Sequence, residues 1–65
     1  MFHCRYYQTF MDYESPMELN LAAALLCATS SLQADKYCMA VDIISNDCPE
    51  LVFRIMREED YEEEG

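Results

Sequence analysis

Residues 15–34, SPMELNLAAALLCATSSLQA, decide the fold of this chain. Their apolar side chains recur at steps of three and four, which is the spacing of one face of an α-helix. Ser15 is a good helix cap, Pro16 is tolerated at the first helical position, and Glu18 completes a capping box. We therefore expect a helix over residues 15–34. Its predicted apolar face comprises Met17, Leu21, Ala24, Leu25, Ala28 and Leu32, widened by Leu19, Ala22 and Leu26.

The sequence on either side of this helix has the alternating pattern of β-strands. Residues 2–13, FHCRYYQTFMDY, alternate as a half-buried strand does. Residues 37–45, YCMAVDIIS, and 51–56, LVFRIM, alternate in the same way. Between them, residues 46–49, NDCP, are typical of a turn. The expected order is therefore β-α-β-β, in one small domain over residues 1–57.

This order of elements predicts an α+β fold with the helix on one face of a three-stranded antiparallel sheet. The last two strands should form a hairpin, and a right-handed crossover through the helix would place the first strand parallel to the second. The third strand would then lie between them, which gives the strand order 1-3-2. The other face of the sheet would be solvated and would carry Arg5, Asp42 and Arg54, which we expect to pair across strands.

The charge of the chain is strongly negative. Thirteen acidic residues against four basic ones give a formal net charge of −9. Residues 58–65, EEDYEEEG, form an acidic C-terminal tail that holds six of the acidic residues. Nucleic acids and anionic membranes carry the same sign of charge, so the composition disfavours both as direct partners. We expect instead a protein partner with a basic, nucleic-acid-binding surface.

The composition also argues against several other classes of protein. Glycine occurs once, at Gly65, which excludes the glycine-rich loops that hold nucleotide phosphates. No apolar run approaches the roughly 20 residues needed to cross a bilayer. The N-terminus, MFHCRYYQTF, lacks the basic and apolar regions of a secretion signal. We expect a soluble, intracellular protein.

Four cysteines are many for a chain of this length, but no two have a C-x-x-C spacing. We expect reduced thiols rather than a disulfide or a metal site. Cys4 and Cys27 lie near the apolar faces of their elements, whereas Cys38 and Cys48 flank the hairpin and can be exposed. A nucleophilic pair of His3 with a cysteine would also need an orienting group and a pocket, for which the chain has little volume. We therefore expect no metal, no cofactor and no enzymatic activity.

The acidic sequence can imitate a nucleic acid. In an extended segment, side chains two residues apart lie about 6.6 Å from each other on one side, and phosphates along a DNA strand are spaced on a similar scale. Carboxylates would speed encounter and select a basic partner, while buried tyrosines would prolong the contact. The predicted partner-binding residues are Glu58, Glu59, Asp60, Tyr61, Glu62, Glu63, Glu64, Asp42, Asp47, Glu50, Asp12, Tyr13 and Glu14.

A very small, acidic, single-domain chain without a catalytic motif or a secretion signal is similar to the inhibitors that phages encode against bacterial defence. In particular it resembles the small anti-CRISPR proteins, among them inhibitors of type I-C systems. The resemblance concerns the overall character of the whole chain and rests on no motif. It implies an inhibitor in the cytoplasm of the host bacterial cell. That inhibitor would bind a crRNA-guided complex of the Cascade type and block its DNA site by DNA mimicry.

Two other interpretations stay open at this point. The acidic tail can serve solubility alone. The chain can also be a small protein-interaction or antitoxin-like module, monomeric or homodimeric, that binds through an apolar surface. That surface would contain Val52 and Met56 with Tyr7 and Tyr13 nearby. Affinity that collapses with salt favours the acidic decoy, whereas affinity nearly insensitive to salt favours the apolar surface.

Overall fold

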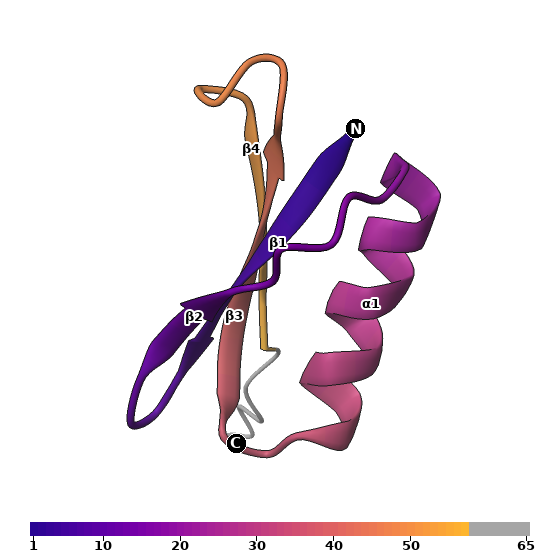
Figure 1. The fold of residues 1–65 in the computed structure, drawn as a ribbon. Coiled ribbons are helices and arrows are strands. Elements are labelled where there is room, and N and C mark those ends of the chain that lie inside the picture. Colours follow the sequence, from indigo (N-terminus) through magenta and orange to yellow (C-terminus); the bar gives the residue numbers. More distant parts are fainter. Residues whose placement is uncertain (58–65) are drawn as a thin grey trace, which may run out of the picture.

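A computed structural model describes residues 1–57, so the predicted acidic tail at 58–65 lies outside the described residues. The described elements are β1 (Phe2–Gln8), β2 (Asp12–Glu14), α1 (Leu21–Ala34), β3 (Cys38–Ser45) and β4 (Val52–Met56). The strands form one sheet of order β2-β1-β3-β4 in which every neighbouring pair is antiparallel. The helix lies on one face of this sheet (Figure 1). The predicted α+β class is confirmed, and so is the hairpin between the last two strands.

The first predicted strand is in fact a hairpin, so the described sheet has four strands rather than three. The chain reverses after Gln8, whose backbone N–H donates to the carbonyl of Met11 at 2.9 Å. Tyr13 of β2 then lies opposite Tyr6 of β1, and the two rings stack with their centroids 5.1 Å apart. The prediction was wrong here because no glycine or proline marks the reversal.

The predicted strand order 1-3-2 is also wrong. β1 pairs directly with β3, and β4 lies at the edge of the sheet. The hairpin explains the difference, because β2 rather than β1 leads into the helix. β2 and β3 run in the same direction on either side of β1. The predicted parallel crossover therefore exists, but it connects β2 to β3 and encloses β1.

The helix begins at Leu21, five residues later than Pro16, the first helical residue that the capping box predicts. Asn20 is its cap, with the side-chain oxygen accepting from the N–H of Ala23 at 2.8 Å. The preceding Leu19 is extended and exchanges two backbone hydrogen bonds with Phe2, of 2.7 and 2.8 Å. These bonds hold the segment before α1 against the start of β1, which prevents an earlier helical turn. The hydroxyl of Ser15 accepts a local N–H two residues further on instead, at 3.3 Å.

The core lies between α1 and the two central strands. Its helical side is made of small residues and one leucine, since Ala24 and Ala28 are fully buried and Leu32 nearly so. Small side chains let the helix come close to the sheet, so burial raises the pKa of the Tyr6 hydroxyl beneath it to about 12. The core residues that pack around these are Cys4, Tyr6, Cys38, Val41 and Ile43.

Two details of the core differ from the sequence expectation. Cys38 is fully buried rather than exposed, because the register of β1 and β3 shifts at this point: Tyr7 faces Ala40, but Gln8 faces Cys38. The shift leaves Met39 as a bulge and turns Cys38 toward the helix.

The predicted apolar face of the helix is also only partly buried. Its exposed members are Ala22 and four larger residues, Met17, Leu21, Leu25 and Leu26, with 57%, 38%, 41% and 67% of their surfaces exposed.

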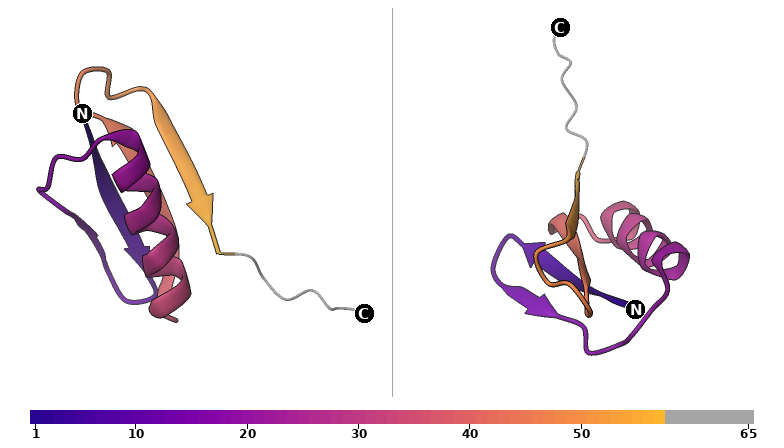
Figure 2. Two further views of the ribbon diagram at one scale, coloured as in Figure 1. Left: turned by 90° about the vertical axis from the view of Figure 1, so that its right-hand side faces the viewer. Right: turned by 90° about the horizontal axis from the view of Figure 1, so that it is seen from above.

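The helix covers the sheet unevenly. It packs mainly on β3 and β1, little on β4 and not on β2. β4 stands beside the helix in both views of Figure 2. α1 has 14 residues, and within residues 1–57 no helix is long and apolar enough to cross a membrane.

Candidate partner-binding surface

The open face of the sheet, on the side away from α1, carries a connected polar network. Alternation along the strands places Arg5 and Tyr7 of β1, Asp42 of β3 and Arg54 of β4 on this face. Arg54 donates two hydrogen bonds to Asp42, and the Tyr7 hydroxyl donates a third at 2.9 Å. Both guanidinium groups also lie near the Tyr7 ring, at 5.5 Å for Arg5 and 5.3 Å for Arg54. The predicted pairing across the strands is thus confirmed for Asp42 and Arg54.

Asp42 is the centre of this network and is 4% exposed. The hydrogen bonds from Arg54 lower the pKa of the Asp42 carboxyl, and they outweigh burial, which acts in the opposite direction. The same pair raises the pKa of the Arg54 guanidinium. Asp42 is therefore an anion whose charge is already satisfied inside the protein. It has little free surface with which to meet a partner.

Arg5 lies opposite Asp42 in the register of β1 and β3, but it makes its salt bridges with the edge strand β2. Its guanidinium lies 3.8 Å from a carboxylate oxygen of Asp12 and 3.6 Å from one of Glu14. Glu14 in turn lies 3.7 Å from the ring of His3. These contacts are half exposed, so each contributes little to stability. They nevertheless gather Asp12, Glu14 and their neighbour Tyr13 on one exposed edge of the sheet.

The other predicted partner-binding residues of the described chain lie in the loop between β3 and β4. The side chain of Asp47 is 90% exposed and lies 3.7 Å from the N-terminal amine. Glu50 is also exposed, and its carboxylate accepts a hydrogen bond from the Cys48 thiol at 3.1 Å. The seven remaining predicted residues, from Glu58 to Glu64, lie outside the described residues.

All four basic residues of the chain make internal contacts. Arg5 and Arg54 pair with carboxylates, and Lys36 lies over the ring of Tyr37 with its nitrogen 5.4 Å from the centroid. Arg57 binds the end of β4 to the start of β3. Its backbone N–H and its guanidinium donate to carbonyls of residues 39, 38 and 35, at 2.9, 3.0 and 2.6 Å. The four basic residues therefore make contacts within residues 1–57. Because the acidic residues outnumber them, the chain keeps a net negative charge.

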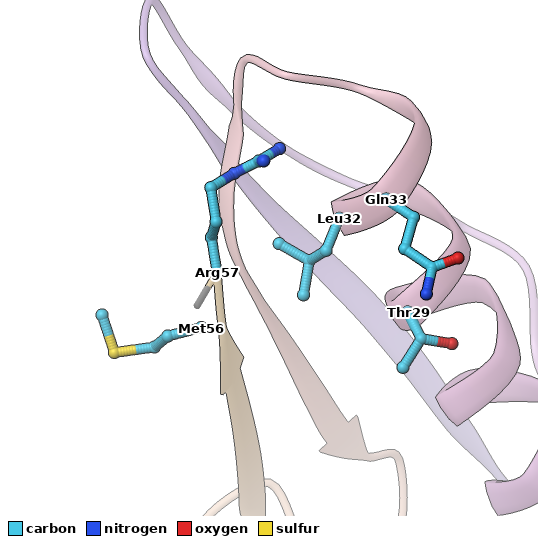
Figure 3. A pocket seen from close by; sticks show the side chains of 5 residues that line it. All are labelled: Thr29, Leu32, Gln33, Met56 and Arg57. Carbon is cyan, nitrogen blue, oxygen red and sulfur yellow. The ribbon is translucent and has the colours of Figure 1, made fainter. Parts of the chain in front are cut away.

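The described surface has two shallow hollows. One lies between the helix and β4 and is lined by Thr29, Leu32, Gln33, Met56 and Arg57. Figure 3 shows that the Met56 side chain points away from the helix, so the hollow meets the backbone of β4 there. The other lies beside His3 and Glu14. Within residues 1–57, no three His, Cys, Asp or Glu residues gather as metal ligands do, and all four cysteines are free thiols.

Two contacts of this surface were not predicted. Alternation gives Tyr7 the parity of Arg5 along β1, so its place on the open face follows from the sequence, but its hydrogen bond to Asp42 was not predicted. The role of Arg57 could not be predicted, because its three acceptors are backbone carbonyls that leave no mark in the sequence. No protein-family model, curated protein or solved structure matches this chain. Its function therefore has to be argued from the chemistry of its own surface.

Proposed function

We propose that this protein is a non-enzymatic inhibitor that binds the basic, nucleic-acid-binding surface of another protein. In its specific form, the proposal is an anti-CRISPR protein that occupies the DNA-binding surface of a Cascade-type complex as an acidic DNA mimic. The observation that carries it is the distribution of charge. All four Lys and Arg residues contact other groups of residues 1–57, and the acidic residues outnumber them by nine.

The acidic sequence is joined to a fixed point of the body. Residues 58–64, with six acidic residues, follow directly after Arg57, which three hydrogen bonds attach to the end of the helix and the start of β3. Exposed Asp47 and Glu50 before β4, and Asp12 and Glu14 on β2 at the opposite edge of the sheet, add further negative charge. Asp42 has no part in this proposal because it is buried.

The test is competition with DNA. A purified type I-C Cascade complex binds fluorescent target DNA, and the protein is titrated in at low and at physiological salt. We expect the protein to displace the DNA. Neutralising the tail (Glu58, Glu59, Glu62, Glu63 and Glu64 to Gln, Asp60→Asn) should weaken inhibition at least about tenfold, because clustered charges select the partner and speed encounter.

Only three acidic residues of the body lie outside the proposed surface, so the six charges cannot be matched there. The control is Glu18→Gln, which neutralises an exposed carboxylate outside that surface. It should inhibit as the wild type does. Unchanged inhibition by the neutralised tail would remove DNA mimicry from the proposal. No inhibition by the wild type would remove Cascade, and a pull-down from bacterial lysate at two salt concentrations would then identify the basic partner.

The exposed apolar residues support a second candidate, a module that binds through an apolar surface. Of the residues predicted for this surface, Val52 and Met56 are 41% and 67% exposed on β4, whereas Tyr13 lies on β2, at the opposite edge of the sheet. Leu26 on the helix and Phe53 on β4 are also exposed, by 67% and 42%. Apolar contact changes little with salt, whereas contact through carboxylates weakens steeply. The salt dependence of partner affinity therefore separates the two candidates.

A further inference from the structure

The two edges of the sheet differ in how they are protected. The β2 edge is three residues long and two of these are acidic, which discourages another strand from pairing with it. The β4 edge, Val52–Met56, is longer and carries one charged residue, Arg54, among four apolar ones. It has neither proline nor lysine. β4 is thus the edge that another strand can join.

The hydrogen bonds of β4 show which of its backbone groups are available. Arg57 donates to the carbonyl of Met39, and the carbonyl of Leu51 accepts from Ser45. Bonded pairs alternate along an antiparallel ladder, so the odd-numbered residues of β4 use their N–H and C=O groups toward β3. The intervening residues, whose backbone groups point away from the sheet, are Val52, Arg54 and Met56.

The side chains beside this edge are also incompletely covered. Phe53 lies opposite the core residue Ile43, on the helix side of the sheet, yet it is 42% exposed. The hollow lined by Thr29, Leu32 and Gln33 lies between the helix and β4 (Figure 3). A strand added to β4 would continue the sheet along this flank of the helix, so its alternate side chains would cover Phe53 and the hollow.

The charges around β4 decide what that strand can be. Exposed Asp47 and Glu50 precede it, and the acidic residues 58–64 follow it. A second copy would bring like charges to both ends. Pairing about a two-fold axis at Arg54 would also place that residue opposite its own copy, which is unfavourable. A strand with basic ends complements the edge instead.

We propose that β4 binds an extended segment of the partner by strand addition, and that this segment has apolar residues at alternate positions and Lys or Arg at both ends. Main-chain hydrogen bonds would supply the affinity, and the alternate side chains the specificity. The inference rests on the proposed function only for the basic character of the partner.

The test uses the full-length protein and a synthetic probe, acetyl-KKVTVTVKK-amide. Its control, acetyl-KKVPPTVKK-amide, has the same charge. It cannot continue the ladder in either register, because one of the two adjacent prolines always lacks the N–H that would point toward β4. In the free protein, the amides of Phe53 and Ile55 should be protected from hydrogen exchange, while those of Val52, Arg54 and Met56 exchange quickly. Saturation with the probe should slow exchange of these last three at least about tenfold, and the control peptide should not.

A pair of variants tests the same point from the protein side. Met56→Pro removes an outward N–H and leaves the bonds to β3, as proline on an edge strand can. Met56→Thr loses the same side chain but keeps the N–H. We expect Met56→Pro to weaken probe binding at least about tenfold, and Met56→Thr to bind within about twofold of the wild type. Circular dichroism and Tm show whether both variants are folded, and the exchange experiment on the wild type needs neither variant.

Three results would overturn strand addition. The first is equal binding of the two peptides, and the second is unchanged hydrogen exchange of the three outward amides. The third is protection of those amides when the protein concentration is raised without peptide, which would show that a second copy of the chain occupies the edge. None of these depends on the acidic tail. Inhibition of Cascade with an unprotected β4 edge would refute strand addition alone. A protected edge with tail-independent inhibition would instead refute DNA mimicry.

Discussion

Arg54 holds Asp42 through two parallel hydrogen bonds, Nε to Oδ1 at 2.7 Å and Nη2 to Oδ2 at 2.9 Å. The Asp42 side chain is 6% exposed, whereas that of Arg54 is 56% exposed. The Arg54 side chain therefore covers the Asp42 carboxylate from solvent in the middle of the open face. This fork-to-fork geometry is the strongest form of the arginine–carboxylate pair, and it makes the open face a fixed structure rather than a row of independent charges.

Removing the third hydrogen bond to Asp42 should lower stability. Tyr7→Phe takes away the hydroxyl that donates to Asp42 at 2.9 Å. We expect a loss of about 1 kcal/mol in the free energy of unfolding, and a fall in Tm of about 4–8 °C for a domain of this size. Thermal unfolding by circular dichroism measures both. The matched control is Tyr37→Phe, since the Tyr37 hydroxyl has no hydrogen-bond partner within residues 1–57; an equal loss there would contradict the prediction.

The contribution of Asp42 should depend on pH. Its pKa in the folded protein lies below the ordinary value of 3.8, because Arg54 favours the ionised form. In acid the unfolded chain takes up the proton first, so the stabilisation is complete above the ordinary pKa and is lost as pH falls through the folded pKa. Urea unfolding from pH 7 to pH 2.5 should show the wild type and Asp42→Asn converging below about pH 4. A gap between them that stays constant with pH would refute this account.

Substitutions at Asn20, the observed helix cap, and at Ser15, the predicted one, should differ in their effect on stability. Asn20→Ala should cost about 1 kcal/mol, because it leaves the N–H of Ala23 without its side-chain acceptor. Ser15→Ala should change stability by less than about 0.5 kcal/mol, since Ser15 lies in the extended segment before the helix. Chemical denaturation measures both, and the reverse ranking would restore the capping box at residues 15–18.

The four thiols should differ in reactivity. Cys48 is exposed, whereas Cys4 and Cys38 are fully buried and burial raises their pKa values. A thiol reagent at pH 8 should therefore modify Cys48 first in the native protein. The hydrogen bond to Glu50 raises the pKa of Cys48, so Glu50→Gln should speed the reaction by increasing the thiolate fraction.

Cys48→Ser serves as the control and should abolish the fast phase. All four thiols should react in denaturant. A fast phase that persists without Cys48 would show that a buried thiol is more accessible than the fold allows.

The elements that could be predicted from the sequence are those with a local signal. Alternation identified the strands of the β3–β4 hairpin, and the Asn-Asp-Cys-Pro turn identified their connection. The same alternation placed Asp42 and Arg54 on one face, where they pair. Each of these depends on residues close in the sequence or on parity alone.

The features that could not be predicted depend on contacts between distant residues. The helix start is set by the pairing of Leu19 with Phe2, which overrides a good local cap at Ser15. The burial of Cys38 depends on a shift of register between two strands 30 residues apart in the chain. The strand order followed from one unmarked reversal after Gln8, because that reversal decides which strand enters the helix.

The three hydrogen bonds of Arg57 determine how force would enter this molecule. They connect the residue to Asp35, which caps the C-terminal end of the helix, and to the first residues of the central strand β3. A pull on the C-terminal sequence would be borne there before β4 could peel from the sheet. A partner that binds the acidic residues would therefore load these three hydrogen bonds first.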